Sequence, residues 1–224
     1  MSGLVSHAQD NYLWWNDVHH WDGHTSWNQY MTYSTSFFGP NALPVPDVMN
    51  GNIDSLKTIE VDGGYNWSKG DKTKDTYIKG YLPLFKNRIA FVLDAVPIEW
   101  YKMDTVTRDL RAARNRSGEG KAGGDIYFQT LIALLKDHKK LPDVSLRIAL
   151  RTASGTNLRN ARYTDGPGYF FDLSAGKNFK TNSIVLRPYA MAGFYVYQTN
   201  DLEHLQNDCV MFGAGVDFFY KKII

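Results

Sequence analysis

Two arginines on one side of an otherwise apolar segment are the first residues whose spacing suggests chemistry. In VSLRIALRTASG, residues 144–155, Arg147 and Arg151 alternate with Leu146, Ile148 and their apolar neighbours. Successive side chains of a β-strand point to opposite faces of its sheet. The segment therefore predicts a strand with one ionic face and one apolar face. A soluble sandwich would turn the apolar face to its core, whereas a membrane barrel would turn it to lipid.

Alternation along the other segments places further charged residues on the same face as these arginines. A charge facing lipid at mid-bilayer costs roughly 2–4 kcal/mol, so we expect the charges to point into a hydrated interior. An internal salt-bridge network that fills a narrow barrel is one interpretation, and a selective pore lining is the alternative. Pro188 disturbs the strand around Arg187. The lumen-lining candidates are Glu60, Asp62, Asp94, Arg147, Arg151, Asp172, Arg187 and Asp217.

A basic stretch lies within the long polar segment 103–124, for which we expect a mobile loop with a helical turn at RDLRAAR. Guanidinium groups match phosphate oxygens well. If this loop is extracellular, it predicts contacts with lipopolysaccharide phosphates, and the alternative is a solvated loop. The candidate contacts are Arg108, Arg111, Arg114, Arg116 and Lys121.

The tract NDVHHWDGHTSW contains three histidines, and His20 and His24 with Asp22 are of the types that bind transition metals. Nothing fixes their spacing as a helix would, and such tracts are usually polar loops. We therefore assign no metal ligand and no cofactor.

Ser154, close to Asn157 and Asn160, weakly resembles outer-membrane lipid hydrolases, which place a serine, a histidine and an asparagine on the barrel wall. No histidine lies near this serine in sequence, and we expect His138 at the opposite rim. A serine without a base is not activated. We assign no catalytic residue, although a hydrolase stays an alternative.

These candidates must be positioned by strands. Alternation predicts strands over 58–67, 75–85, 89–102, 125–135, 144–152, 169–179, 183–198 and 209–220. Two more are expected over 10–16 and 26–38, followed by a proline-containing linker, 39–54, on the side of the short turns. Long and short connections alternate after residue 58, as in outer-membrane barrels. We predict an all-β, antiparallel, up-and-down transmembrane barrel of about ten strands, with a range of 8–12.

Composition is compatible with that architecture. The 224 residues carry a net charge of +2, which gives no global field for nucleic acid, and 14% are aromatic. No stretch approaches the about 18 apolar residues of a spanning helix. The single cysteine, Cys209, excludes an internal disulfide. We interpret residues 1–25 as an N-terminal segment with a first strand, preceded by either a trimmed signal peptide or an ordinary polar N-terminus, and 26–224 as the barrel.

The segments FFGPNALPVPD and LRTASGTNLRNARYTDGPGYFFDLS, with the glycine-rich final strand, resemble Gram-negative outer-membrane β-barrel proteins of the Bacteroidetes type. The resemblance covers most of the chain and carries over no catalytic residue. It implies a location in the cell outer membrane, contact with its lipid and lipopolysaccharide, and a structural or porin-like role with limited transport of a small solute. The chain departs from the pattern in ending YKKII instead of in an aromatic residue, and in lacking a complete signal peptide.

A soluble, calycin-like ligand-binding barrel is a rival of another class. Its lumen would be apolar and its outer surface polar. The alternation of loop lengths and the aromatic residues at strand ends favour the membrane barrel.

Overall fold

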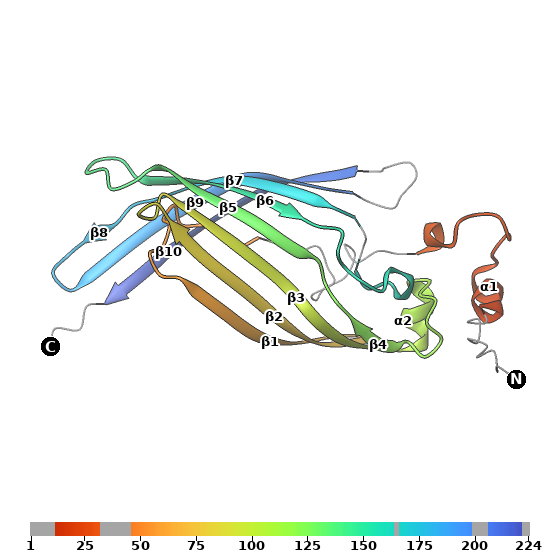
Figure 1. The fold of residues 1–224 in the computed structure, drawn as a ribbon. Helices are drawn as coiled ribbons and strands as arrows, with labels where there is room; N and C mark the ends of the chain where they lie inside the picture. The colour runs from red at the N-terminus through yellow and green to blue at the C-terminus, as the bar shows by residue number, and fades with distance from the viewer. Residues whose placement is uncertain (1–11, 32–45, 164–165, 199–205, 221–224) are drawn as a thin grey trace, which may run out of the picture.

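The long strands of this chain form one antiparallel sheet that is curled into an open half-barrel (Figure 1). The computed structural model describes residues 12–31, 46–163, 166–198 and 206–220. The ten strands are β1 (Thr58–Ser68), β2 (Asp71–Leu84), β3 (Ile89–Met103), β4 (Glu119–Ala122), β5 (Ile126–Leu135), β6 (Asp143–Arg151), β7 (Gly168–Gly176), β8 (Phe179–Lys180), β9 (Ile184–Gln198) and β10 (Gln206–Tyr220).

The sheet order is β1-β2-β3-β5-β6-β7-β9-β10, so each long strand pairs with the next one along the chain. Short β4 pairs with β3, and short β8 pairs with β9. The antiparallel all-β fold is confirmed, and the sheet has ten strands because the short β4 and β8 accompany the eight long strands expected after residue 58. Among the described residues no pairing joins β1 to β10, so both remain edge strands.

The two strands expected before residue 58 are wrong where the structure describes them. Helix α1 (Leu13–His19) replaces most of the strand at 10–16, and the 3-10 helix η1 (Trp27–Tyr30) lies inside the segment 26–38. Residues 10, 11 and 32–45 lie outside the described residues. Trp15 is fully buried, and its indole Nε1 donates to the carbonyl of Ala112 at 2.8 Å. Contacts with a distant loop therefore outweigh the local strand pattern.

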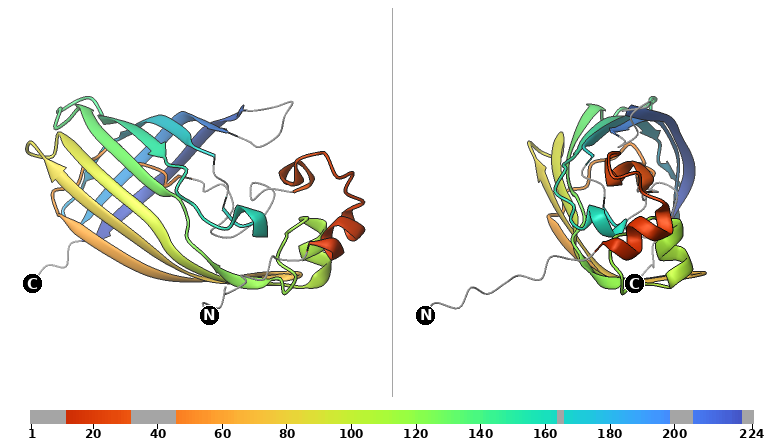
Figure 2. Two further views of the ribbon diagram at one scale, coloured as in Figure 1. Left: turned by 45° about the vertical axis from the view of Figure 1, so that its right-hand side comes forward. Right: turned by 90° about the vertical axis from the view of Figure 1, so that its right-hand side faces the viewer.

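The connections separate by length between the two ends of the half-barrel. The long connections 104–125 and 152–167 follow β3 and β6, and the shorter 85–88, 136–142 and 177–183 lie at the other end. The two-residue turn 69–70 is the exception, because it lies at the long-loop end beside Met103. The expected alternation therefore holds from β2 onward among the described connections. Helix α2 (Thr105–Leu110), the 3-10 helix η3 (Leu158–Asn160), α1 and η1 gather at the long-loop end (Figure 2).

We call the described residues 12–31, 104–125 and 152–163 the cap. Their aromatic side chains pack on the rim of the sheet, where Trp15 and Met31 join a buried cluster with Tyr101 and Met103 of β3. Asp104 is the N-cap of α2, because its carboxylate accepts from the backbone N–H of Thr107 at 2.7 Å. This bond lowers the pKa of Asp104.

Residues 46–57, which we call the plug, lie against the inner face of the sheet. Ile53 is buried in a cluster with Ala90, Val92 and Leu131, which project inward from β3 and β5. The linker 39–54 was expected on the side of the short turns, and its described residues 46–54 run inside the half-barrel, where Gly51 approaches Asp143 and Gly176 near that end. Plug residues contact several strands, and these contacts hold the plug in one position although it has no regular secondary structure.

The two faces of the sheet differ sharply in chemistry. In β6, Arg147 is 3% exposed and Arg151 is 6% exposed, whereas Ile148 is 44% and Leu150 is 56% exposed. In β10, Phe212 is 84% exposed. The apolar stripes therefore face outward, and the ionic side chains face the interior.

Candidate binding cavity

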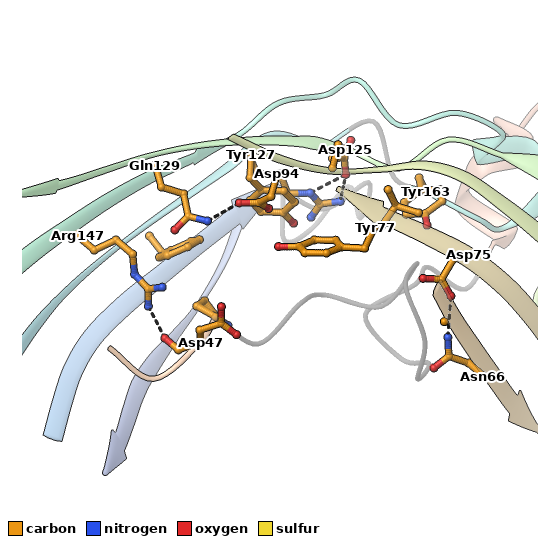
Figure 3. Close-up of a pocket in the computed structure, with 16 residues that line it drawn as sticks. Asp47, Asn66, Asp75, Tyr77, Asp94, Asp125, Tyr127, Gln129, Arg147 and Tyr163 are labelled. Atoms are coloured by element: carbon orange, nitrogen blue, oxygen red, sulfur yellow. Dashed lines mark hydrogen bonds and ion pairs between the residues drawn. The ribbon is translucent and has the colours of Figure 1, made fainter. Parts of the chain in front are cut away.

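A cavity of about 400 Å³ lies inside the half-barrel, between the start of the plug and the inner faces of β2, β3, β5 and β6 (Figure 3). Its walls combine carboxylates, tyrosines and two arginines. The side chains that matter most for its chemistry are Asp75, Tyr77, Asp94, Tyr127, Arg147 and Arg151. They come from four strands, and the antiparallel alternation turns each of them inward.

Each cavity arginine is held by a carboxylate. Arg147 donates from Nε to Asp172 at 2.6 Å and from NH2 to the carbonyl of Asp47 at 2.9 Å. Arg151 donates from Nε to Asp125 at 2.7 Å. These arginines are therefore neutralised by neighbours, and they stiffen the wall more than they attract an anion.

β7 and β9 approach each other closely at Asp172, and a glycine in β9 leaves the space that this side chain needs. Gly193 lies opposite it in β9, and a Cβ added there would lie 2.3 Å from the carbonyl oxygen of Phe171 and 2.6 Å from the Cβ of Asp172. Only glycine fits without a shift of the backbone. The Arg147–Asp172 pair therefore depends on this glycine.

Two other carboxylates of the cavity are bound by amides. Asp94, which is 7% exposed, accepts from the side-chain amide of Gln129. Asp75 accepts from Nδ2 of Asn66 at 3.1 Å. Neither forms an ion pair with any described residue. Lys79 lies opposite Asp94 in the sheet register, but its ammonium pairs with Asp47 at 3.0 Å.

The plug is fixed to the wall by polar contacts as well as by Ile53. Arg187 donates to the carbonyl of Asn50 at 3.1 Å and to Asp143 at 3.0 Å. The Asn50 side chain donates to Asp217 at 2.9 Å. With the bond from Arg147 to Asp47, these contacts tie the plug to β6, β9 and β10.

Six of the eight lumen-lining candidates thus point into the interior: Asp94, Arg147, Arg151, Asp172, Arg187 and Asp217. Glu60 and Asp62 lie on edge strand β1 and are exposed. Glu60 still borders a second inner cavity of about 390 Å³ with Asp47 and Lys79. The side chains of β1 are exposed because no strand continues the sheet beside it among the described residues.

A cluster of buried charges lies under the cap, and it was not predicted from the sequence. Arg162 donates from Nε to Glu99 at 2.7 Å and lies 3.3 Å from Asp71. Arg111 pairs with Asp71 at 2.6 Å, and the hydroxyl of Tyr163 donates to Glu99 at 3.1 Å. Alternation along β3 puts Glu99 on the same inward face as Tyr101. This pattern is the one feature of the sequence that indicates a buried carboxylate at residue 99.

The five basic residues proposed for lipopolysaccharide contact fall into two groups. Arg108 and Arg111 are buried, and Arg114 lies over the Tyr12 ring with 3.7 Å to its centroid. These three hold the cap together. Arg116 and Lys121 are exposed. The segment is not one loop, because it forms α2 and β4.

The remaining candidates are engaged locally. Asp22 accepts from the backbone N–H groups of His24 and Thr25, and the hydrogen bonds it accepts, the largest from the Thr25 side chain, lower its pKa to about 2. Ser154 accepts from the backbone N–H of Ile126 at 3.0 Å, while Asn160 donates to the Tyr101 hydroxyl at 2.9 Å. The geometry therefore uses these residues in turns and rim contacts.

Within the described ranges, no group of three or more His, Cys, Asp and Glu side chains is arranged to hold a metal ion. Nor is any helix described there both long enough and apolar enough to cross a membrane. No protein-family model matches the chain, and no curated protein matches it either.

Proposed function

We propose that this chain is an integral β-barrel protein of a Gram-negative outer membrane, with a structural role and a limited capacity for a small solute. The observation that carries the proposal is the outward apolar face of the sheet. Side chains on every long strand contribute to it, including Ile59 at 83%, Leu173 at 51% and Phe218 at 61% exposure. Apolar surface spread over a whole sheet is rare on proteins surrounded by water.

The polar interior supports the same proposal. A ligand-binding barrel in water would bury its apolar side chains and expose its charges. Here Arg147, Asp172, Ser145 and Ser174 are almost fully buried, and the two serine hydroxyls hydrogen-bond at 2.8 Å. Polar and charged side chains inside and apolar side chains outside are the pattern expected of transmembrane strands.

The plug and the wall ion pairs favour a structural or solute-binding role over an open diffusion pore. They occupy the interior on either side of the cavity, and Arg187 and Asp217 both contact Asn50 of the plug. What is left is a bounded cavity, which suits one small molecule at a time.

The helical end is the proposed cell-surface end, because outer-membrane barrels carry their long loops outside. On this assignment the exposed Arg116 and Lys121 are the side chains positioned to meet lipopolysaccharide phosphates. Arg108 and Arg111 stabilise the cap from within.

Membrane insertion is tested with two single variants, each of which replaces an exposed leucine with arginine. Leu173 lies in the middle of β7 on the apolar face, and Leu110, which is 72% exposed, lies in the cap. We expect Leu173→Arg to reduce insertion into phospholipid vesicles strongly, since an arginine at mid-bilayer costs roughly 2–4 kcal/mol. Leu110→Arg is the matched control and should insert normally.

The readouts are co-flotation with vesicles and faster gel migration before boiling than after. A wild-type chain that stays monomeric at high concentration without detergent and does not bind vesicles would refute the proposal. Equal insertion of both arginine variants would refute the assignment of the apolar face to lipid.

A further inference from the structure

We infer that the cavity beside the plug binds a small organic cation, with short aliphatic diamines as the best-fitting class. The inference builds on the solute role proposed above and names the chemistry of that solute. It rests on the charge balance of the cavity, on its aromatic walls and on its size.

The ion pairs of the cavity leave two carboxylates without a salt bridge, although Lys79 and Arg147 lie near enough to Asp94 to interact with its charge. Asp125 is paired with Arg151, Asp47 is paired with Lys79, and Arg147 is paired with Asp172 outside the cavity. Among the described residues, these pairs engage every charged group that lines the cavity except Asp75 and Asp94. Asp94 is 7% exposed, and a carboxylate removed from water is costly unless it is paired and hydrogen-bonded, whereas Asp75 is only half-buried.

The described residues offer little else to balance these two carboxylates. Each has one amide donor, from Asn66 or Gln129. The segment that precedes the plug, residues 32–45, contains no charged residue in its sequence. A bound ammonium group would supply the missing positive charge and further hydrogen-bond donors.

Aromatic rings complete the environment of a cationic ligand. Tyr77, Tyr127, Tyr163 and Phe170 all line the cavity. Figure 3 shows Tyr77 of β2 projecting toward Asp94 of β3, with Asp75 turned toward Asn66. The faces of aromatic rings attract cations, and they also pack against alkyl chains. An alkylammonium ligand uses both properties.

A local glycine places one of these carboxylates. Gly64 of β1 lies opposite Asp75, and a Cβ added to it would come within 2.8 Å of three carboxylate atoms of Asp75. The absence of a side chain at residue 64 therefore lets Asp75 fold over β1 at the cavity wall.

The arrangement discriminates against other ligand classes. A hard divalent cation needs several oxygen ligands that converge on one point, and the described residues contain no such group. A neutral sugar would leave the carboxylates uncompensated. The volume of about 400 Å³ lies in the ordinary range for small-molecule sites.

The test is calorimetric titration of the folded protein in detergent with 1,4-diaminobutane. The matched neutral probe is 1,4-butanediol, which has the same length, and Ca²⁺ is the metal probe. We expect saturable binding of the diamine only. Asp94→Asn and Asp75→Asn should each weaken it at least about tenfold, which corresponds to about 1.4 kcal/mol.

Asp62→Asn is the control variant, because Asp62 is exposed on β1 and outside the cavity. It removes the same charge and should leave the affinity unchanged. Equal binding of the diol, binding of Ca²⁺ alone, no binding of the diamine, or undiminished binding to Asp94→Asn would each overturn the inference. A protein that inserts into vesicles without binding the diamine refutes only this inference. One that binds the diamine but stays soluble refutes only the membrane assignment.

Discussion

The cap and the cavity contain the same kinds of residue, carboxylates with arginines and tyrosines, but they use them differently. Under the cap, Glu99 receives Arg162 and the Tyr163 hydroxyl, and Asp71 receives two arginines. In the cavity, Asp94 receives one amide. Carboxylates that are paired with arginines fix the loops of the cap to the rim of the sheet. A carboxylate that receives only an amide can still bind a cationic ligand.

Burial does not separate the two regions. Glu99 is fully buried, and Asp94 is 7% exposed. What differs is the partner, since a guanidinium group supplies charge and several donors, and an amide supplies donors without charge. Carboxylates under the cap therefore stabilise the fold, whereas those in the cavity can bind a ligand.

The largest effect is expected from breaking the pairing under the cap. Glu99→Gln keeps the size of the side chain but leaves Arg162 without its main counter-charge in a buried site. We expect a loss of roughly 3–5 kcal/mol in the free energy of unfolding. Urea unfolding followed by tryptophan fluorescence measures it. Arg116→Ala, at an exposed arginine of the same segment, should change little, and a comparable loss there would contradict this explanation.

A smaller loss is expected where the wall of the half-barrel is tightest. Gly193→Ala forces a methyl group against the Phe171 carbonyl and Asp172, at a cost of roughly 1–3 kcal/mol. Gly63→Ala is its matched control, because nothing lies within 4 Å of a Cβ at that position. If both alanine variants unfold at the same urea concentration, the close approach of β7 and β9 does not constrain the Arg147–Asp172 pair.

The sequence predicted the long strands and the direction of the charges because both follow from local alternation. Arg147 and Ile148 are neighbours in the chain and face opposite sides of the sheet, as the pattern requires. For the same reason six of the eight lumen candidates turn toward the interior of the half-barrel. Glu60 and Asp62 are exposed instead of buried because β1 is an edge strand, with no described strand beside it to cover their side chains.

Residues that obtain their structure from distant contacts were not predictable in this way. Arg162 reaches Glu99 across 63 positions of sequence, and Trp15 reaches Ala112 across 97. No local period encodes such pairs. The plug was missed for the same reason, since Asn50 acquires its place from Arg187 and Asp217. Proline and glycine near it indicated only that it is not a strand.

A local loss is expected when α1 is detached from the cap. Trp15→Phe removes the indole N–H that bonds the carbonyl of Ala112, at a cost of about 1 kcal/mol. The wall should be unaffected, so limited proteolysis should cut faster within residues 12–31 while diamine binding stays the same. Trp67→Phe, at a tryptophan that is 73% exposed, is the control. Weaker diamine binding in Trp15→Phe would show that the cap and the cavity are coupled.

The smallest effect on stability is expected in the cavity itself. Asp94→Asn changes a buried carboxylate, as Glu99→Gln does, but it breaks no ion pair with a described residue. An amide at this position can still bond the Gln129 side chain after that amide turns over. We expect the free energy of unfolding to stay the same or to rise slightly, because a carboxylate without an ion pair is removed from a buried site, although diamine affinity falls. If Asp94→Asn instead destabilises the protein as much as Glu99→Gln, Asp94 is a structural group like those of the cap, and the contrast between the two regions fails.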